Sequence, residues 1–513
     1  MRNARKPYYR MSLDRAPKAV RRGLAIVFAM TLAACGAAQR QDARLVAFAS
    51  SNILKNSARA KNVILFVGDG MGVSTVTAMR ILAGQRAGKS GEDHVLPFET
   101  FENTALIKTY NSNQQVPDSA GTATSLLSGM KTKAGFIGMG PTAFRGDCQS
   151  SKGAEIRTLL EMAAEAGLST GIVTTARLTH ATPAAAYAHS PERGWEADSD
   201  MPEVERAAGC RDIARQFVEF TPGGGVDVAF GGGRANFLPA SATDPEHAAL
   251  RGKRADGRDL VEAWRKANSG GLFVWNTRTF GAIDLDAAKK VLGLFEPGHM
   301  QFEVERNKDD TGEPSLTDMT RKAIQILSRN EKGYVLLVEG GRIDHAHHAG
   351  NALRALTEGV EFARAVGLAN NMTSSEDTLI VVTADHSHTF AIAGYPTRGN
   401  PIFGKVVGND ERGEPMNGPD KADDGKPYTT LGYYATPGAV DDKPRQDITH
   451  IDTAHPDYLQ QSAVFLRSGA HGGEDVPAYA RGPNADVVRG VMEQQFLFDV
   501  MRDALGLRAA RAP

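Results

Sequence analysis

The chain has 513 residues, of which 41% are hydrophobic, a mixture that can form a large buried core and excludes a disordered polymer. Its 59 basic and 60 acidic side chains leave a formal net charge of -1, so no whole-chain field attracts nucleic acid or an anionic lipid surface. Any attraction for a charged substrate must therefore be local.

The first 35 residues differ in composition from the rest. A basic stretch ending at Arg22 runs into the apolar segment LAIVFAMTLAA and stops at Cys35, which is the pattern of a signal peptide over residues 1–34. The apolar run is about half as long as a bilayer-spanning helix requires, so a transmembrane anchor is the weaker interpretation, as is a buried N-terminal helix. Residues 32–36, LAACG, resemble the lipobox of bacterial lipoproteins. This predicts lipidation of Cys35 and an exported protein, in the periplasm or on the cell surface, tethered to a membrane through residues 35–57.

If Cys35 is lipidated, Cys148 and Cys210 remain as a pair in an oxidising compartment. An even number of cysteines there favours a disulfide bridge. Two free buried thiols are the alternative.

Three apolar runs end in polar residues, and each has the length of one strand. They are KNVILFVGDGMG at 61–72, KGYVLLVEGG at 332–341 and DTLIVVTADHSH at 377–388. Such runs suit central strands of a parallel sheet that are buried on both faces. Since the carboxyl ends of parallel strands meet at one edge, we expect the acids and histidines that follow them to form one composite site.

Helix-like stretches such as residues 153–167 lie between these runs, with apolar residues at helical spacing and glycine at the end. The alternation predicts an α/β fold: a doubly wound, mostly parallel central sheet with helices on both faces. The stretch 396–466 is instead rich in Gly, Pro and Asp and is expected to be an insertion outside the sheet. The catalytic domain would then comprise residues 58–395 and 467–513.

Histidines gather at two of the predicted strand ends. In GGRIDHAHH, Asp344 and His348 are four residues apart on one face of a predicted helix, where they could share a metal ion. In TADHSH, Asp385 and His386 are adjacent, which suits one metal ion only where the backbone turns at a strand end. Mixed carboxylate and imidazole ligands favour zinc over calcium or magnesium. A hydrogen-bonded core or surface histidine is the alternative for either cluster alone.

Ser119 lies in QVPDSAGTATSLLSG, where Pro117 and Asp118 precede the predicted start of a helix. A serine there meets the positive end of the helix dipole and free backbone N–H groups, which favour a bound phosphate. Taken alone, Asp118 or Ser119 could be only a helix N-cap, and Asp69 only a turn residue. The two histidine clusters make the functional interpretation the stronger one.

Five motifs, in the same order, resemble those of alkaline phosphatases. They are DGMG near residue 70, PDSAGTAT near 119, VEGGRIDHAHH near 345, TADHSH near 386 and HGGEDV near 472. The resemblance extends from about residue 60 to 505. It is closest to the animal enzymes, and it includes the segments TPAAAYAHSPERGW at 182–195 and GLFEPG at 293–298. Membership of this family would imply hydrolysis of phosphate monoesters through a phosphoserine.

The resemblance implies a role for each candidate site residue. Ser119 would be the phosphorylated serine, Arg193 the bidentate clamp on the phosphate, and Asp118 the residue that holds Arg193. The implied metal ions are a zinc ion on Asp344, His348 and His471, a zinc ion on Asp69, Asp385 and His386 that faces Ser119, and a magnesium ion on Asp69, Thr182 and Glu339. Position 182 usually carries serine in the animal motif, and threonine keeps the hydroxyl.

Further implied features surround this centre. His180 and His345 would lie beside the magnesium site, as in animal enzymes, whereas several bacterial enzymes have aspartate and lysine there. A calcium ion would take Glu246, Glu296, Glu313 and the carbonyl oxygen of Phe295. Glu313 replaces an aspartate after a slightly longer loop, and a solvated acidic surface is the alternative for these glutamates.

The resemblance also bears on covalent and quaternary structure. It implies a bridge between Cys148 and Cys210. It also implies a homodimer in which residues 396–466 form the so-called crown region at the subunit interface.

Two other functions are compatible with parts of the sequence. A phosphodiesterase, sulfatase or phosphonate-ester hydrolase of the same metal-hydrolase superfamily is the first, but Arg193 argues against it. Diesterases of that group generally use threonine as the nucleophile, and sulfatases need a different motif for formylglycine. The second is a lipid-anchored binding protein without turnover, which would not need the complete set of metal ligands.

Overall fold

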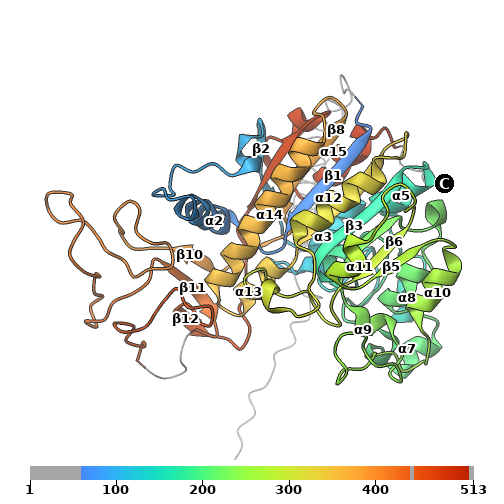
Figure 1. Ribbon diagram of the computed structural model, residues 1–513, viewed down its shortest axis with the longest axis horizontal. Helices are drawn as coiled ribbons and strands as arrows, with labels where there is room; N and C mark the ends of the chain where they lie inside the picture. Colours follow the sequence, from blue (N-terminus) through green and yellow to red (C-terminus); the bar gives the residue numbers. More distant parts are fainter. Residues whose placement is uncertain (1–58, 439–443, 508–513) are drawn as a thin grey trace, which may run out of the picture. The chain divides into compact units, whose positions relative to one another are not determined.

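The computed structural model describes residues 59–438 and 444–507, so the predicted signal peptide, the tether and Cys35 lie outside the described residues. Within the described part of the chain, no helix combines the length and the apolar character needed to cross a membrane. Figure 1 shows the elements of this part in chain order.

A ten-stranded sheet forms the centre of the described part, with the order β15-β2-β14-β8-β1-β7-β3-β4-β6-β5 (Figure 1). Only β14 in this sheet runs antiparallel to its neighbours, β2 and β8. The predicted doubly wound, mostly parallel α/β fold is therefore confirmed. The strands are β1 (Asn62–Gly68), β2 (Asn103–Lys108), β3 (Ser169–Arg177), β4 (Val228–Gly232), β5 (Leu272–Val274), β6 (Val291–Leu294), β7 (Tyr334–Gly340), β8 (Thr378–Ala384), β14 (Val476–Arg481) and β15 (Gly490–Glu493).

The three strands predicted from the sequence are neighbours at the centre of this sheet. Every residue of β1, β7 and β8 is buried, as expected for apolar runs covered on both faces. Their register places Gly68 of β1 beside Gly340 of β7 and Ala384 of β8. The polar residues that follow the three strands therefore start at one edge of the sheet.

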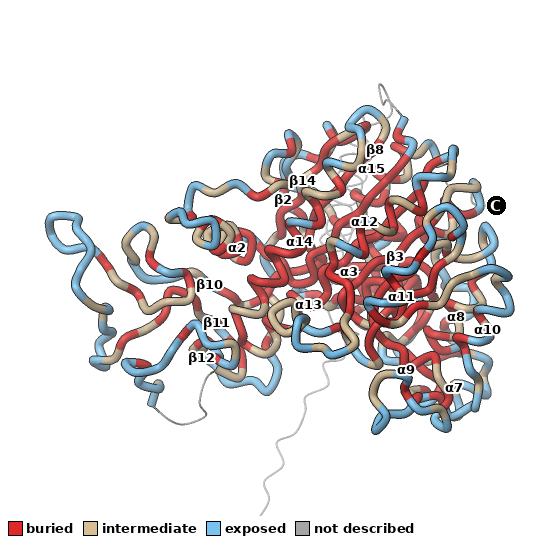
Figure 2. The backbone as a smooth tube through the Cα atoms, in the orientation of Figure 1, coloured by how far each residue is buried: buried red, intermediate tan, exposed pale blue. Residues whose placement is uncertain are grey.

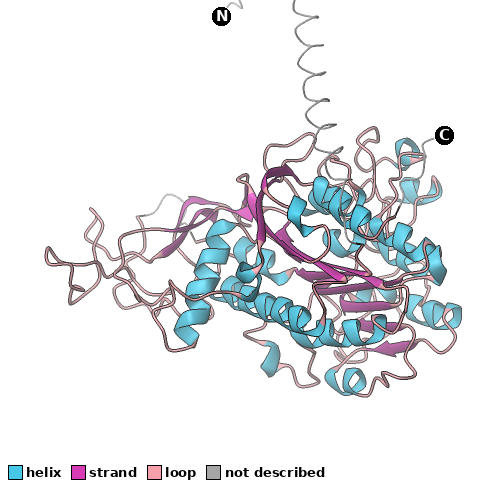
Figure 3. Ribbon diagram, turned by 90° about the horizontal axis from the view of Figure 1, so that it is seen from above, coloured by secondary structure: helices cyan, strands magenta, loops and turns pink. Residues whose placement is uncertain are grey.

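Helices cover both sides of the sheet (Figure 3). In one group α12 and α13 pack against α14, which also contacts α2, and in the other α3 contacts α5, α6 and α15. Figure 2 shows that buried residues concentrate in the sheet and exposed residues in the outer loops. These helices are α2 (Val73–Arg86), α3 (Ser119–Ser128), α5 (Leu159–Glu165), α6 (Ala181–Ala184), α12 (Leu316–Leu327), α13 (Arg342–His348), α14 (Ala352–Met372) and α15 (Phe496–Ala504).

The remaining helices of the described residues are short. The α-helices are α4 (Cys148–Ser151), α7 (Glu203–Ala207), α8 (Ile213–Val218), α9 (Arg234–Phe237), α10 (Leu260–Ala267) and α11 (Thr277–Gly281). The 3₁₀ helices are η2 (Pro97–Thr100), η3 (Asp198–Asp200), η4 (Pro222–Gly224), η5 (Arg306–Lys308) and η6 (Ala485–Val487).

The helix expected over residues 153–167 is shorter in the structure, where α5 covers Leu159–Glu165. Thr158 caps its start, because the Thr158 hydroxyl accepts from Glu161 N–H while the Glu161 carboxylate accepts from Thr158 N–H. The residues before the cap hydrogen-bond to another segment: Gly140 N–H donates to the Ala154 carbonyl, and Ile156 N–H to that of Gly138. This pairing explains why the helix does not begin earlier.

Residues 396–466 lie outside the ten-stranded sheet and are mostly loop. They supply β11 (Leu431–Thr436) and β12 (Ser462–Phe465) to a three-stranded sheet with β10 (Phe390–Ile392), on the left of Figure 1. A two-stranded ladder joins β9 (Ser387–His388) to β13 (His471–Gly472) and sets His388 opposite His471. The domain boundaries given above remain predictions.

Candidate active site

Ser119 is the first residue of α3, next to the sheet edge. Asp118 caps this helix, since its side chain accepts a hydrogen bond of 3.1 Å from Gly121 N–H. Ser119 is only 2% exposed, and its Oγ lies 3.1 Å from His386 Nε2. The helix start thus holds a buried hydroxyl beside an imidazole, close to free N–H groups of the first helical turn.

Asp118 also holds Arg193, with 3.1 Å between Asp118 Oδ2 and Arg193 Nη1. Gly135 N–H and Asn111 Nδ2 donate to the same carboxylate at 2.9 Å each. Burial tends to raise the pKa of Asp118, but the charge of Arg193 and the hydrogen bonds from Gly121, Arg193 and Gly135 outweigh it, so the pKa is lowered. An ionised Asp118 therefore orients a guanidinium near Ser119.

The first set of metal donors joins the predicted residues Asp344, His348 and His471 with one further histidine, His388. Asp344 lies 3.4 Å from His348 Nε2, 2.5 Å from His388 Nε2 and 3.6 Å from His471 Nε2. Burial raises the pKa of Asp344, but the three imidazoles reverse the effect and lower it well below its usual value. The carboxylate is thus ionised and available as a ligand.

Backbone carbonyls hydrogen-bond to the Nδ1 atoms of two of these imidazoles, His471 and His348. His471 Nδ1 is 2.8 Å from the Pro117 carbonyl, and His348 Nδ1 is 2.5 Å from that of Gly469. Each carbonyl can only accept, so the proton sits on Nδ1 and the Nε2 lone pair is free. The Nε2 atoms of His471 and His348 are 3.1 Å apart. Two lone pairs that face each other with no proton between them fit a metal ion.

A second set brings Asp69 and His386 next to Asp344. His386 Nε2 lies 3.4 Å from Asp69 Oδ1 and 3.3 Å from Asp385 Oδ2. The chain turns after β1, where Gly70 N–H donates to Asp385 Oδ1 at 3.0 Å. The structure therefore brings together Asp69, Asp385, His386 and Ser119, which were predicted to share one ion.

Asp69 gives the clearest physical sign of a cation. It is fully buried, yet neither of its carboxylate oxygens has a hydrogen-bond partner. Burial, reinforced by the charges of Asp385, Asp344 and Glu339, raises its pKa well above the usual value. An unpaired buried carboxylate is costly unless a cation neutralises it, so this site fits a metal ion.

A third set contains Asp69, Glu339 and His180. One oxygen of Glu339, the Thr182 hydroxyl and His180 Nδ1 are all buried without a partner. Burial raises the pKa of Glu339 to about 7. The structure thus groups the predicted magnesium ligands and adds His180, which was expected only beside the site.

His345 lies next to this third set. The His345 ring centroid is 5.2 Å from that of His180 and 4.0 Å from that of His299. His299 was not predicted, because its only sequence signal is the position after GLFEPG.

An outer cluster of acids stands apart from the three donor sets. It comprises Glu246, His247, Glu296, Asp309 and Glu313, in two overlapping groups that share Glu296. The predicted calcium ligands Glu246 and Glu313 fall in different groups, while Phe295 is buried directly before Glu296. His247 and Asp309 were not predicted.

The two groups of the outer cluster differ in how their acids are neutralised. Arg234 donates to Glu246 at 2.7 Å, so this carboxylate already has a cation. Glu313 is only 3% exposed and one of its oxygens has no partner, while burial and the charge of Glu296 raise its pKa to about 9. The need for a bound cation is therefore greatest at Glu313.

The predicted disulfide is present. Cys148, the first residue of α4, is bonded to Cys210 across a Cα–Cα distance of 5.7 Å. The alternative of two free thiols is wrong.

His388 is the most central residue that the sequence did not identify as a donor. Its signal was available, because TADHSH places it two residues after His386 and alternate residues of a strand point to the same face. What the sequence could not give is the β9–β13 ladder that sets His388 beside His471.

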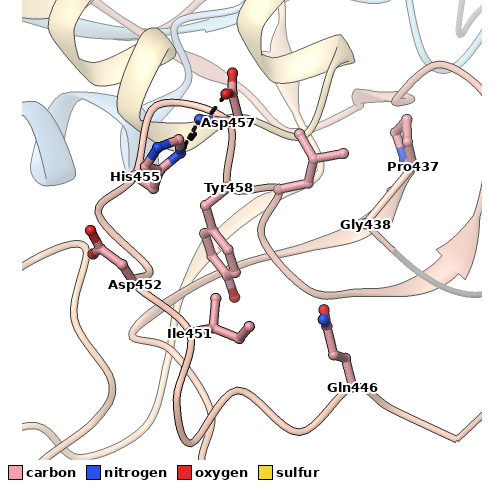
Figure 4. Close-up of a pocket in the computed structure, with 9 residues that line it drawn as sticks. Pro437, Gly438, Gln446, Ile451, Asp452, His455, Asp457 and Tyr458 are labelled. Carbon is pink, nitrogen blue, oxygen red and sulfur yellow. Dashed lines mark hydrogen bonds and ion pairs between the residues drawn. The ribbon is translucent and has the colours of Figure 1, made fainter.

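A separate surface pocket of about 490 Å³ lies in the loop-rich segment. Figure 4 shows His455, Asp457 and Tyr458 on its wall. Its lining residues belong to none of the donor sets, so we assign it no part in the active site.

The sequence of this chain is similar to those of proteins with known activity. The family profile described as alkaline phosphatase matches residues 60–507. The tissue-nonspecific isozyme of alkaline phosphatase from Gallus gallus is 47% identical over 461 residues, which cover 88% of this chain and 86% of the relative. The Homo sapiens isozyme of the same name is 48% identical over 454 residues, covering 87% and 84%.

Solved structures agree at the level of the fold. The alkaline phosphatase of Thermus thermophilus has a TM-score of 0.62 at 24% identity and covers 88% of this chain and 92% of its own. That of the Antarctic bacterium TAB5 has a TM-score of 0.59 at 22% identity, covering 88% and 100%.

Proposed function

The chain belongs to the alkaline phosphatase family and has the metal-dependent phosphatase activity of that family, and on this premise we propose that it hydrolyses phosphate monoesters through a phosphoserine at Ser119. The observation that carries the proposal is the position of the Ser119 hydroxyl, 3.1 Å from His386 within the metal-donor sets and at the start of α3. Such a hydroxyl can reach a phosphorus atom that the same groups hold.

Arg193 and the start of α3 would bind the phosphate. Asp118 fixes Arg193 through Nη1, which leaves other guanidinium N–H groups for the phosphate oxygens. Asp118 occupies the Gly121 N–H, whereas the N–H groups of Ser119 and Ala120 have no carbonyl partner within the helix and can donate to the same oxygens. A dianionic monoester offers more oxygens to these donors than a diester does, which favours the monoester as substrate.

The donor sets support the ions expected from the family. One zinc ion would be held by Asp344, His348 and His471, a second by Asp69, Asp385 and His386, and a magnesium ion by Asp69, Thr182 and Glu339. Two metal ions at such a centre neutralise charge on the attacking and leaving oxygens of an in-line displacement. Asp69 belongs to two sets, so its carboxylate would bridge two ions.

The reaction would proceed in two displacements at phosphorus. The Ser119 oxygen forms a bond to phosphorus while the bond to the alcohol oxygen breaks, and the alcohol leaves with a proton. Water then attacks the phosphoserine, which releases inorganic phosphate and restores the Ser119 hydroxyl. In both steps Arg193 keeps two phosphate oxygens in place while the phosphorus inverts.

The outer cluster supports a calcium ion held by Glu246, Glu296, Glu313 and the Phe295 carbonyl. Carboxylate and carbonyl oxygens are the ligands that calcium prefers. One carboxylate oxygen of Glu313 has no hydrogen-bond partner and is available to bind the ion. Because Glu246 is paired with Arg234, we assign the larger share of binding to Glu296 and Glu313.

We further propose a homodimer and a lipid anchor. Tyr434, Val464 and Phe465 on β11 and β12 are exposed apolar or aromatic residues, which support residues 396–466 as the subunit interface. The Cys148–Cys210 bridge supports export to an oxidising compartment. Attachment through Cys35 would then hold the enzyme at the periplasmic or outer membrane surface.

The experiment that tests the function compares an aryl phosphate monoester with the matching diester and sulfate. We expect the monoester to be hydrolysed fastest, chelator to abolish turnover, and Ser119→Ala to lose about 10³-fold or more of kcat. Ser128→Ala, at the other end of α3, is the control and should retain activity. A preference for the diester or sulfate, or full activity in chelator, would contradict the proposal.

A further inference from the structure

His347 is a buried histidine that belongs to none of the metal-donor sets. Its side chain is fully buried, and both ring nitrogens have partners: Nδ1 lies 2.7 Å from the Tyr433 hydroxyl and Nε2 lies 3.0 Å from the Thr75 hydroxyl. A neutral imidazole has one N–H and one lone pair, and a hydroxyl can take either role, so both contacts are satisfied together.

These partners come from three different segments of the chain. Thr75 lies in the first turn of α2, Tyr433 lies in β11 of the three-stranded sheet, and His347 lies in α13. The helix α2 also contacts β10. Phe390 of β10, which pairs in register with Tyr433, packs against the His347 ring with the centroids 5.0 Å apart.

Metal donors lie close in the chain to α2, to α13 and to β10, which pairs with β11. Asp69 lies one short turn before α2, His388 lies two residues before Phe390, and Asp344 and His348 flank His347 in α13. The His347 ring also packs 5.0 Å from the His388 ring. A rotation of α13 would therefore move His347 away from its partners and, at the same time, change the donor distances at Asp344.

We propose that His347 is a positioning residue, held by Tyr433 and Thr75, which fixes α13 so that Asp344 and His348 meet one metal ion. The three-stranded sheet thereby supports the metal centre from outside the ten-stranded sheet. This inference rests on the proposed zinc site. The loss of a hydrogen-bonded partner behind the ligands of a metal ion typically weakens metal binding by about 10- to 100-fold.

Tyr433→Phe tests this role, because it removes one hydroxyl and keeps the ring. Tyr395→Phe is a matched control at a tyrosine whose side chain is 89% exposed and which belongs to no proposed site. For the full-length protein we would measure zinc affinity by competition with a chromophoric chelator, and the melting temperatures of the metal-free and zinc-loaded forms. We expect Tyr433→Phe to weaken the binding of one zinc ion by about 10- to 100-fold, and Tyr395→Phe to match the wild type.

Position 75 provides a second test. Thr75→Val removes the other hydroxyl and should weaken zinc binding in the same direction, whereas Thr75→Ser keeps the hydroxyl and should restore wild-type affinity. A fall in metal-free melting temperature with unchanged zinc affinity in Tyr433→Phe and Thr75→Val would mean that the contacts only stabilise the fold, which overturns the proposal.

The same measurements separate this inference from the proposed function. If the wild type binds no zinc or hydrolyses no phosphate monoester, the proposed function fails. If the wild type does both, and Tyr433→Phe has wild-type zinc affinity, only the role of His347 fails.

Discussion

The central donor sets and the outer cluster contain the same kinds of acid but are built on different supports. Asp69, Glu339 and Asp385 lie within or directly after three adjacent strands, β1, β7 and β8, whose register is fixed by a continuous ladder. Glu246 and Glu313 lie in loops between elements. The comparison indicates that the sheet orients the central donors before any ion binds, whereas the outer donors depend more on the ion for their arrangement.

The largest effect is expected from a substitution in the central donor sets. Asp344→Asn removes the charge that faces three imidazoles, and we expect kcat/KM for an aryl phosphate monoester to fall by about 10³-fold or more, because metal-ion catalysis supplies several kcal/mol of the barrier reduction. The matched variant Glu313→Gln in the outer cluster should keep kcat/KM within about threefold of wild type. Equal losses in the two variants would contradict the distinction.

A smaller effect is expected from a change at Arg193, the proposed phosphate clamp, which leaves the metal donors intact. Arg193→Lys keeps the charge but loses the planar fork, so we expect kcat/KM to fall by about 10- to 100-fold through the loss of one charge-assisted hydrogen bond. Zinc and magnesium content, measured by elemental analysis, should stay at the wild-type level. Loss of metal in this variant would mean that Arg193 belongs to the support of the donor sets.

The pH dependence of metal binding distinguishes the two regions further. Burial raises the pKa of Glu339 to about 7 and that of Asp385 to about 6 in the metal-free protein. Of the two, Glu339 is a proposed magnesium ligand and must lose its proton before it binds that ion, so magnesium affinity should fall as pH decreases below about 7, by about tenfold per unit for this proton. Isothermal titration at pH 8, 7 and 6 measures this slope. A magnesium affinity independent of pH over this range would contradict the prediction.

The smallest effect concerns stability in the outer cluster. The folded-state pKa of Glu313, about 9, is above its usual value of 4.5, so ionisation opposes folding and metal-free stability should decrease as pH rises between these values. Glu313→Gln removes this penalty. In chelator, its melting temperature should equal that of the wild type near pH 5 and exceed it by on the order of 2 °C at pH 9. Added calcium should raise the melting temperature of the wild type only.

The parts of the molecule that the sequence predicted are those with strong local patterns. Three buried strands were recognisable from apolar runs, and their polar ends indicated Asp69, Asp344 and Asp385 as one site. His388 was not identified as a donor although it follows His386 by two residues, because the ladder that sets it beside His471 joins residues far apart in the chain.

The start of α5 was missed for a related reason. Apolar spacing continued before Thr158, but residues 138–140 pair with the backbone there and the capping box begins the helix later. His247 and Asp309 lie in loops without periodicity, and nothing in the sequence linked them to Glu296. Local pattern thus gives strands and the residues at their ends, whereas contacts between distant loops require the folded chain.

The position of β14 has a consequence for how the enzyme matures. This strand begins shortly after His471, the last residue of the donor sets, and lies between β8 and β2, so the sheet is completed only when this late segment pairs with two strands that precede it in the chain. A chain still emerging from the ribosome or the export channel therefore lacks a complete centre, however well its first half has collapsed. Catalytic competence then requires the chain to be delivered and folded through β14, and a precursor that ends before His471 remains inert.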